Sequence, residues 1–403
     1  MNTHGDSVRN HGRHSLHLFI SKMSFMKTFM KRDAFVIIIP ALLIFLTLVV
    51  LAPSCRKNDI IKLKNFEQVN LVANNDEYDA PTIEPLLVNA WGLAWAPSGI
   101  AWVNAEDGHI SALFNGEGVA PRKPVNIPGP AGPATGSPTG IVFNGGADFV
   151  LSNGAAARFI FVGADGVLSG WNGTAGDNAI LIKDNSATSA YTGLAIGVSH
   201  GANHIYAADF RAGKIVVWNK DFHPVDMEFS DPNVPDGYAP FNIQAVGDWL
   251  YVTYAKVGDD GEEETGVGKG FVSIFNTDGS FVKRFASRDL LNAPWGVTMA
   301  DKSFFKDDED NSGDSGDDDS GKTAHHDSNR ILIGNFGDGK INVYTTDGVF
   351  VGQLLSHGHP LVIEGLWAIG FAPATSTIDQ HRLYFTAGPE DEEDGLFGYL
   401  IKK

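Results

Sequence analysis

The sequence contains little cysteine and little positive charge, and each shortage excludes a class of protein. One Cys among 403 residues excludes a disulfide scaffold and any zinc or iron–sulfur site built from several cysteines. Lysine and arginine number 30 against 48 aspartates and glutamates, which gives a formal net charge of −18 at pH 7. This balance argues against binding to nucleic acid phosphates or to an anionic membrane face. A hydrophobic content of 43% excludes a disordered chain.

The first segment of the chain has the pattern of an export signal. Lys27, Lys31 and Arg32 precede the uncharged apolar run Ala34–Ala52, which is the order of charges and apolar residues in such signals. The run is also long enough for a permanent membrane helix. It ends at Ala52-Pro53-Ser54-Cys55, which resembles the lipobox of a bacterial lipoprotein, in which the cysteine becomes the lipidated first residue.

This resemblance implies an address in the cell envelope. We expect residues 1–54 to be the signal peptide, Cys55 to carry the lipid, and residues 55–65 to be a tether. The protein would then be anchored by lipid at the outer membrane of a bacterium, or on its periplasmic or extracellular face.

Beyond residue 65 the chain is a repeat. A small or aromatic residue, then Gly, then an apolar run recurs at spacings of about 50 residues. The clear copies are Trp91-Gly92-Leu93, Thr139-Gly140-Ile141, Thr192-Gly193-Leu194 and Trp295-Gly296-Val297, and the weaker ones are Phe241-Asn242-Ile243 and Trp367-Ala368-Ile369. The last spacing is longer because an acidic insert occupies residues 301–327.

Each repeat phrase is followed by further segments with the composition of β-strands, bounded by Gly, Asn and Asp. The expected second strands are Ile100–Asn104, Phe149–Asn153, His204–Asp209, Trp249–Tyr254, Ile331–Asn335 and Arg382–Thr386. The expected third strands are Ile110–Phe114, Phe159–Gly163, Lys214–Trp218, Phe271–Phe275, Lys340–Tyr344 and Leu396–Leu400. Asp-Gly turns then lead to fourth strands. Four short strands per unit predict an all-β fold, a six-bladed β-propeller over residues 66–403.

The ends of the chain predict how the ring closes. The sixth unit stops after its third strand, and the segment Gln68–Ala73 precedes the first unit as a lone apolar strand. Pairing this strand with the sixth unit would complete the last blade and remove an open sheet edge.

Four segments carry a resemblance to known propellers: Asn89–Leu93, Ser137–Gly140, Ala293–Val297 and Gly334–Ile341. On these the chain resembles NHL-type six-bladed propellers and, more closely, an uncharacterised family of secreted bacterial proteins, some of which end in PEP-CTERM sorting tails. The resemblance implies a fold and an exported location, and it implies no known activity.

The residue before each repeat glycine is expected near the mouth of the central channel. In a propeller the innermost strands line the channel, and the loops that enter them share a face with the loops joining second to third strands. The candidate ligand-binding residues are therefore Trp91, Thr139, Thr192, Asn242, Trp295 and Trp367. An aromatic mouth suits a sugar, a peptide or a flat organic ligand; the alternative is that the tryptophans pack between blades. Trp and Thr stand where calcium-dependent lactonases of this architecture have metal ligands, which argues against that chemistry.

Two loops are candidates for metal binding. His357 and His359, with Glu364 nearby, have the residue types of an open metal site, and a metal-free surface loop is the simpler alternative. In the insert, Asp308, Asp310, Ser312, Asp314 and Asp319 approximate the spacing of an EF-hand-like Ca²⁺ loop, against the alternative of a solvated acidic loop. Two more acidic loops, residues 259–264 and 390–394, each join a second to a third strand and are expected on the face of the channel mouth.

These observations favour a binding function. We expect a lipid-anchored propeller that binds a protein, peptide or carbohydrate at the channel mouth and does not bind nucleic acid. A metal-dependent hydrolase or lyase at the same mouth is one alternative, and a structural envelope protein is another. The sequence contains no nucleophile elbow, phosphate loop or dinucleotide fingerprint, so it identifies no catalytic residue.

Overall fold

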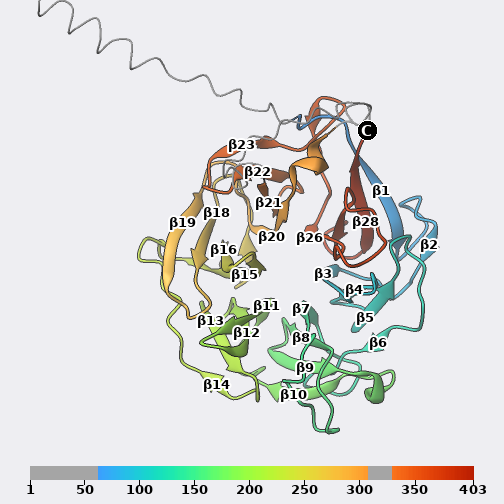
Figure 1. Cartoon of the computed structure of the whole chain (residues 1–403), viewed down its shortest axis with the longest axis vertical. Coiled ribbons are helices and arrows are strands. Elements are labelled where there is room, and N and C mark those ends of the chain that lie inside the picture. Colours follow the sequence, from blue (N-terminus) through green and yellow to red (C-terminus); the bar gives the residue numbers. More distant parts are fainter. Residues whose placement is uncertain (1–61, 307–328) are drawn as a thin grey trace, which may run out of the picture. The chain divides into compact units, whose positions relative to one another are not determined.

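The computed structural model in Figure 1 describes residues 62–306 and 329–403, and within them the strands form sheets arranged around one axis. These residues belong to one unit, residues 60–403. The sheets are six antiparallel blades, each with its first strand innermost, as in a six-bladed β-propeller (Figure 1). The predicted fold class is therefore confirmed. The expected export signal and Cys55 lie outside the described residues.

The first three blades follow one another along the chain. Blade 1 contains β3 (Ala90–Trp95), β4 (Ala101–Ala105), β5 (Ile110–Phe114) and β6 (Val125–Asn126). Blade 2 contains β7 (Pro138–Phe143), β8 (Phe159–Gly163), β9 (Val167–Trp171) and β10 (Ile180–Asp184). Blade 3 contains β11 (Tyr191–Ser199), β12 (Ala202–Asp209), β13 (Lys214–Asn219) and β14 (Pro224–Val225).

Of the other three blades, blades 4 and 6 carry an extra strand. Blade 4 contains β15 (Tyr238–Val246), β16 (Trp249–Val257), β18 (Gly270–Phe275) and β19 (Phe281–Ser287), with β17 (Glu263–Glu264) paired to β16. Blade 5 contains β20 (Pro294–Ala300), β21 (Arg330–Asn335), β22 (Ile341–Thr345) and β23 (Phe350–Gln353). Blade 6 contains β26 (Leu366–Phe371), β27 (Leu383–Ala387), β28 (Leu396–Lys402), β1 (Phe66–Ala73) and β2 (Thr82–Ile83). A hairpin, β24 (Leu355–Ser356) and β25 (His359–Pro360), precedes blade 6.

The ring closes as the sequence predicts. Strand β1 pairs antiparallel with β28, from Phe66 opposite Lys402 to Ala73 opposite Leu396. The side chain of Phe66 is fully buried and packs against Phe304, with ring centroids 5.0 Å apart. The first strand therefore covers the edge that blade 6 would otherwise expose.

The glycine of the repeat phrase is explained by a close approach between neighbouring blades. A Cβ added to Gly92 would lie 2.1 Å from the carbonyl oxygen of Thr139, and one added to Gly140 would lie 2.5 Å from the backbone nitrogen of Leu194. These distances are far below van der Waals contact. The innermost strands of adjacent blades meet at these positions, so only glycine fits there.

Hydrophobic burial holds the blades together. In the described part of the chain, six of the hydrophobic clusters join adjacent blades, and a further one is made of residues from the innermost strands and the loops beside them. Strands inside a blade, such as β4 and β8, are buried along their whole length because both of their faces contact neighbouring blades. The described helices are two short 3₁₀ segments, Gly173–Ala175 and Lys302–Phe305, and no described helix has the length and apolarity to cross a membrane.

Blade 2 departs from the predicted strand assignment. The expected second strand, Phe149–Asn153, lies in the connection between β7 and β8, and the expected third strand, Phe159–Gly163, is the second. Strand β9 was not predicted. The connection is apolar because Phe149 is fully buried against Phe222, so its hydrophobicity comes from packing and not from strand pairing. Its backbone is left-handed at Phe149, with a φ of 62°, which is incompatible with a regular strand.

Candidate functional site

Three of the predicted site residues meet across the axis of the propeller. Trp91 of blade 1 stacks on Trp367 of blade 6, with ring centroids 3.6 Å apart and planes 14° apart. Trp295 of blade 5 contacts both rings edge-on, at 6.5 and 6.0 Å. Phe336 stacks on Trp367 at 4.0 Å, and Phe241 of blade 4 lies 5.8 Å from Trp367. We call these five residues the aromatic plug.

The plug obstructs the centre of the ring. Its members include residues from blades that are not neighbours, such as blades 1 and 5 or blades 4 and 6. Four of the rings extend inward from the innermost strands, and Phe336 extends from the turn after β21. Trp367 is fully buried, and its indole nitrogen donates to the side-chain oxygen of Asn89 at 2.8 Å. The indole nitrogen of Trp295 donates to the carbonyl oxygen of Thr192 at 2.9 Å. The buried indole nitrogen of Trp91 has no hydrogen-bond partner among the described residues.

The other three predicted residues connect different blades: Thr139 and Asn242 join neighbouring blades, and Thr192 joins blade 3 to blade 5. The hydroxyl of Thr139 donates to the carbonyl oxygen of Tyr191 at 2.6 Å. The side-chain nitrogen of Asn242 donates to the carbonyl oxygen of Trp295 at 2.8 Å, and Thr192 accepts the indole hydrogen bond described above. The structure thus brings the predicted set together at one level of the ring. All six side chains are buried, at 6% exposure or less, and their role in ligand binding stays a prediction.

A cavity of about 610 Å³ lies beside the plug, and we call it the acidic cavity. Its lining includes Trp91 and the loops that join second to third strands. Glu106 comes from blade 1, Glu263 from blade 4 and Glu392 from blade 6. Asp260 and Glu262 also line it, and Arg211 is the one basic residue among its described lining residues. The two acidic loops expected at the channel mouth do meet there, whereas Glu106 was not predicted.

Hydrogen bonds from Asn89 hold the carboxyl groups of Glu106 and Glu392 in place, and the loop that carries Glu392 has an unusual backbone. The side-chain nitrogen of Asn89 donates to Glu392 at 2.6 Å and to Glu106 at 3.4 Å. Glu390, Asp391 and Glu392 are three successive residues with left-handed backbone, at φ values of 53°, 52° and 71°. Such conformations are costly for residues other than glycine, and they concentrate at functional sites.

The burial of these groups changes their acidity. Burial raises the pKa of Glu106 to about 7, and the negative charge of Asp107 adds to the increase. Burial raises the pKa of Glu263 to about 8, and the charge of Glu392 contributes. Burial also raises the pKa of Glu392. A positive charge that approached the cavity near neutral pH would therefore stabilise the ionised form of these carboxyl groups.

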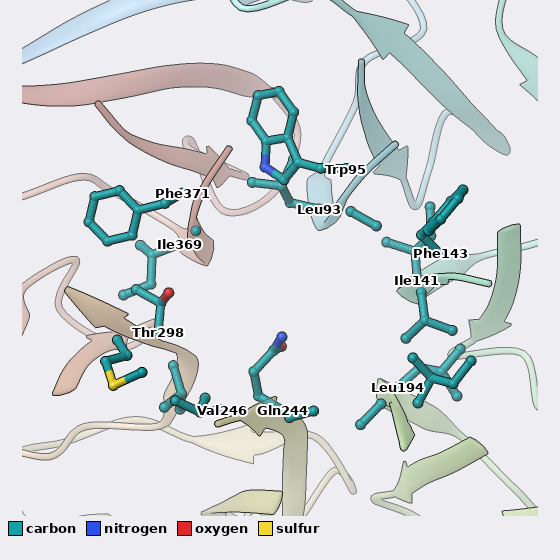
Figure 2. A pocket seen from close by; sticks show the side chains of 18 of the residues that line it. Leu93, Trp95, Ile141, Phe143, Leu194, Gln244, Val246, Thr298, Ile369 and Phe371 are labelled. Atoms are coloured by element: carbon teal, nitrogen blue, oxygen red, sulfur yellow. The ribbon is translucent and has the colours of Figure 1, made fainter. Parts of the chain in front are cut away.

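A second cavity, of about 430 Å³, is lined by the later residues of the innermost strands. Figure 2 shows Leu93, Trp95, Ile141, Phe143, Leu194, Val246, Ile369 and Phe371 around it, with Gln244 and Thr298. We call it the apolar cavity. The acidic cavity is lined by loops that enter or precede the starts of these strands, for example at Ala190 and Gly237. The two cavities therefore lie toward opposite ends of the innermost strands.

The candidate metal residues do not form a site in the part of the chain that the structure describes. His357 and His359 are exposed in the β24–β25 hairpin, and Glu364 is exposed beyond it. The Nδ1 atom of His357 lies 3.0 Å from the hydroxyl of Ser356. No group of three or more His, Cys, Asp or Glu residues with metal-binding geometry occurs among the described residues. Asp308, Asp310, Ser312, Asp314 and Asp319 lie outside them.

Comparison with known proteins gives viral relatives and enzymes of similar fold. No family model matches the chain. The uncharacterized protein L690 of Acanthamoeba polyphaga mimivirus is 30% identical over 353 residues, covering 83% of this chain and 86% of the relative. The uncharacterized protein R648 of the same virus is 29% identical over 349 residues, covering 83% and 80%.

Among solved structures, the chain is similar to the GH93 α-L-arabinofuranosidase of Fusarium graminearum in complex with arabinobiose. The TM-score is 0.50 at 8% identity, covering 84% of this chain and 98% of that one. A streptogramin B lyase structure has a TM-score of 0.45 at 15% identity, with coverage of 84% and 98%. At such identities the likeness to the arabinofuranosidase shows the fold alone.

Proposed function

This chain belongs to the same family as the mimivirus protein L690, and we propose that it is a binding module whose acidic cavity takes a positively charged group of a peptide or protein. The observation that carries the proposal is the meeting of Glu106, Glu263 and Glu392, from three separate blades, in one cavity. Charge complementarity of this kind gives specificity and speeds association. Surface loops are where propellers and other rigid scaffolds hold their ligand-binding residues.

The charges of the cavity favour a cation over a neutral sugar. Five acidic residues and one basic residue are among the described residues that line it. The raised pKa values of Glu106 and Glu263 reflect the energetic cost of ionising buried carboxyl groups without a nearby cation. A bound lysine or arginine side chain would supply that cation. Binding would then release protons from these carboxyl groups.

The wall of the cavity supports the same ligand. Trp91 lines the acidic cavity and belongs to the aromatic plug. An aromatic ring beside a cluster of carboxylates attracts a cation through its negative face.

The test is a calorimetric titration of the full-length protein with an acetylated and amidated tri-lysine peptide, and with the equivalent tri-glutamine peptide. We expect tri-lysine to bind, to bind more weakly at high salt, and to release protons near pH 7. Replacing Glu263 and Glu392 together by Gln should weaken binding at least about tenfold, because two of the attracting carboxylates are lost.

The control is Asp248→Asn, which removes one negative charge from the exposed turn between β15 and β16 and is compared with each single variant, Glu263→Gln and Glu392→Gln, as well as with the double variant. It should leave the dissociation constant unchanged. Equal binding of tri-lysine and tri-glutamine, or equal weakening by Asp248→Asn, would contradict a cation site in the acidic cavity.

We also propose that Cys55 is lipidated and attaches this module to the bacterial cell envelope. The support is the order of the basic residues, the apolar run Ala34–Ala52 and Cys55 in the sequence. Cys55→Ala should move the protein from the membrane fraction to the soluble fraction. Retention of this variant with an uncut N-terminus would instead indicate a transmembrane anchor. The metal-dependent hydrolase or lyase stays an alternative prediction for the channel mouth.

A further inference from the structure

The apolar cavity has the features of a binding site of its own. It is lined by all six innermost strands, and none of the described residues in its lining is charged. Its lining residues are mostly aliphatic, and the rings of Trp95, Phe143 and Phe371 extend away from the open space (Figure 2). Met299, which also lines it, is 38% exposed, so the cavity is open to solvent. The exposed surface combines apolar side chains with polar groups, which suits an uncharged occupant that has both an apolar body and a hydrogen-bonding group.

Polar groups in this cavity have no partner of their own. The side-chain amide of Gln244 points into the cavity in Figure 2, and neither this amide nor the hydroxyl of Thr298 makes a hydrogen bond to the described residues. A few unsatisfied polar groups in an otherwise apolar cavity orient a ligand and give specificity.

We propose that the apolar cavity binds a small uncharged molecule with a flat or aliphatic body and one hydrogen-bonding group, which Gln244 anchors. An ionic ligand would need an opposite charge to offset the loss of its hydration, and the described lining residues carry none. The volume of about 430 Å³ lies within the range of pockets for small organic ligands. This inference is independent of the cation site, because the two cavities have no lining residue in common.

The probe is N-phenyl-1-naphthylamine, an uncharged aromatic amine whose fluorescence rises in apolar surroundings. Titration of the full-length protein should give saturable binding of one probe per chain. Thr298→Trp places a large side chain in the cavity and should abolish the saturable signal. Ala245→Trp fills the exposed rim of the same cavity and should also abolish the saturable signal. It provides the test if Thr298→Trp does not fold.

Two further variants make the test specific. Val349→Trp adds the same side chain at a residue that is 62% exposed and outside the cavity, and it should bind the probe like the wild type. Gln244→Met keeps an unbranched side chain of similar length and removes the amide, so the dissociation constant should rise about three- to tenfold.

The result that supports the proposal is saturable binding that both cavity-filling variants lose and Val349→Trp retains. No saturable binding by the wild type, or full binding by the folded cavity-filling variants, would overturn it. An unchanged dissociation constant in Gln244→Met would overturn the assignment of Gln244 as the anchor.

Discussion

The two cavities lie toward opposite ends of the same six innermost strands, yet one is acidic and the other carries no charge among its described lining residues. The apolar cavity is built from strand residues such as Leu93, Ile141 and Val297. The acidic cavity is built largely from loop residues such as Glu106 and Glu392. The aromatic plug lies between these two levels of the ring, since Trp91 lines the acidic cavity and Leu93, two residues later, lines the apolar one.

This difference shows which residues the fold itself constrains. Strand residues must pack against neighbouring blades, so their apolar character follows from the fold and says little about a ligand. Loop residues are free of that demand, so a concentration of half-buried carboxyl groups on several loops needs another reason. A ligand is the physical reason that we propose for it.

The largest expected effect comes from removing the centre of the plug. Trp367→Ala deletes a fully buried ring that stacks on Trp91 and Phe336. It should lower the free energy of unfolding by about 3–5 kcal/mol, measured by denaturant titration. Trp249→Ala, at a residue that is 42% exposed, should change it by less than about 1 kcal/mol. Equal losses in the two variants would mean that the plug does not stabilise the ring.

The next largest effect is a dependence of the free energy of unfolding on pH, caused by the carboxyl groups of the acidic cavity. Glu106 and Glu263 have folded-state pKa values of about 7 and about 8, above the ordinary 4.5 of glutamate. Between pH 4.5 and these folded-state values, the folded protein therefore binds more protons than the unfolded chain. The free energy of unfolding should fall as pH rises from 5 to 8. Carboxyl groups with lowered pKa, such as Asp231, lose their contribution at pH values below this window.

The measurement is the free energy of unfolding at pH 5 and at pH 8. We expect a decrease on the order of 2 kcal/mol, well below the full linkage value because both side chains are partly exposed. The double variant Glu106→Gln, Glu263→Gln should largely remove it. Asp248→Asn should retain the full decrease. If the free energy of unfolding rises between pH 5 and pH 8 in the wild type, or if the double variant keeps the same pH dependence, the pKa values of Glu106 and Glu263 are not raised in the folded protein.

The smallest effect concerns the one basic residue of the described cavity lining. Arg211→Gln removes a positive charge from the acidic cavity, where the Arg211 side chain donates only to the backbone oxygens of Ser186 and Ser189. Tri-lysine should then bind about two- to fivefold more tightly. Binding of N-phenyl-1-naphthylamine should not change. Weaker binding of tri-lysine in this variant would show that Arg211 contributes to the ligand contact.

The sequence predicts the fold well where the repeat is regular. Six blades and a closing strand at Gln68–Ala73 follow from recurring strands and from the missing strand of the last unit, and the structure has this strand as Phe66–Ala73. The prediction fails in blade 2, where Phe149 is apolar because it packs against Phe222 and has the composition of a strand without its backbone. A buried loop and a strand cannot be distinguished by apolar residues alone.

The site could be predicted only in part, because its residues are distant in the sequence. Trp91, Trp295 and Trp367 were identified from their place in the repeat, but their mutual stacking depends on how far each ring extends across the axis. Glu106 stands in an ordinary turn sequence, and only the fold brings it near Glu263 and Glu392. The apolar cavity has no distinguishing sequence signal, since residues such as Leu194 and Ile369 resemble the rest of the core.

The most direct test of two separate binding sites is a titration with both probes in one sample. The protein is saturated with N-phenyl-1-naphthylamine and then titrated with tri-lysine, and the order is reversed in a second experiment. We expect each dissociation constant to be the same with and without the other probe. Displacement of either probe by the other, or loss of both bindings in Thr298→Trp, would contradict two independent sites at the two ends of the innermost strands.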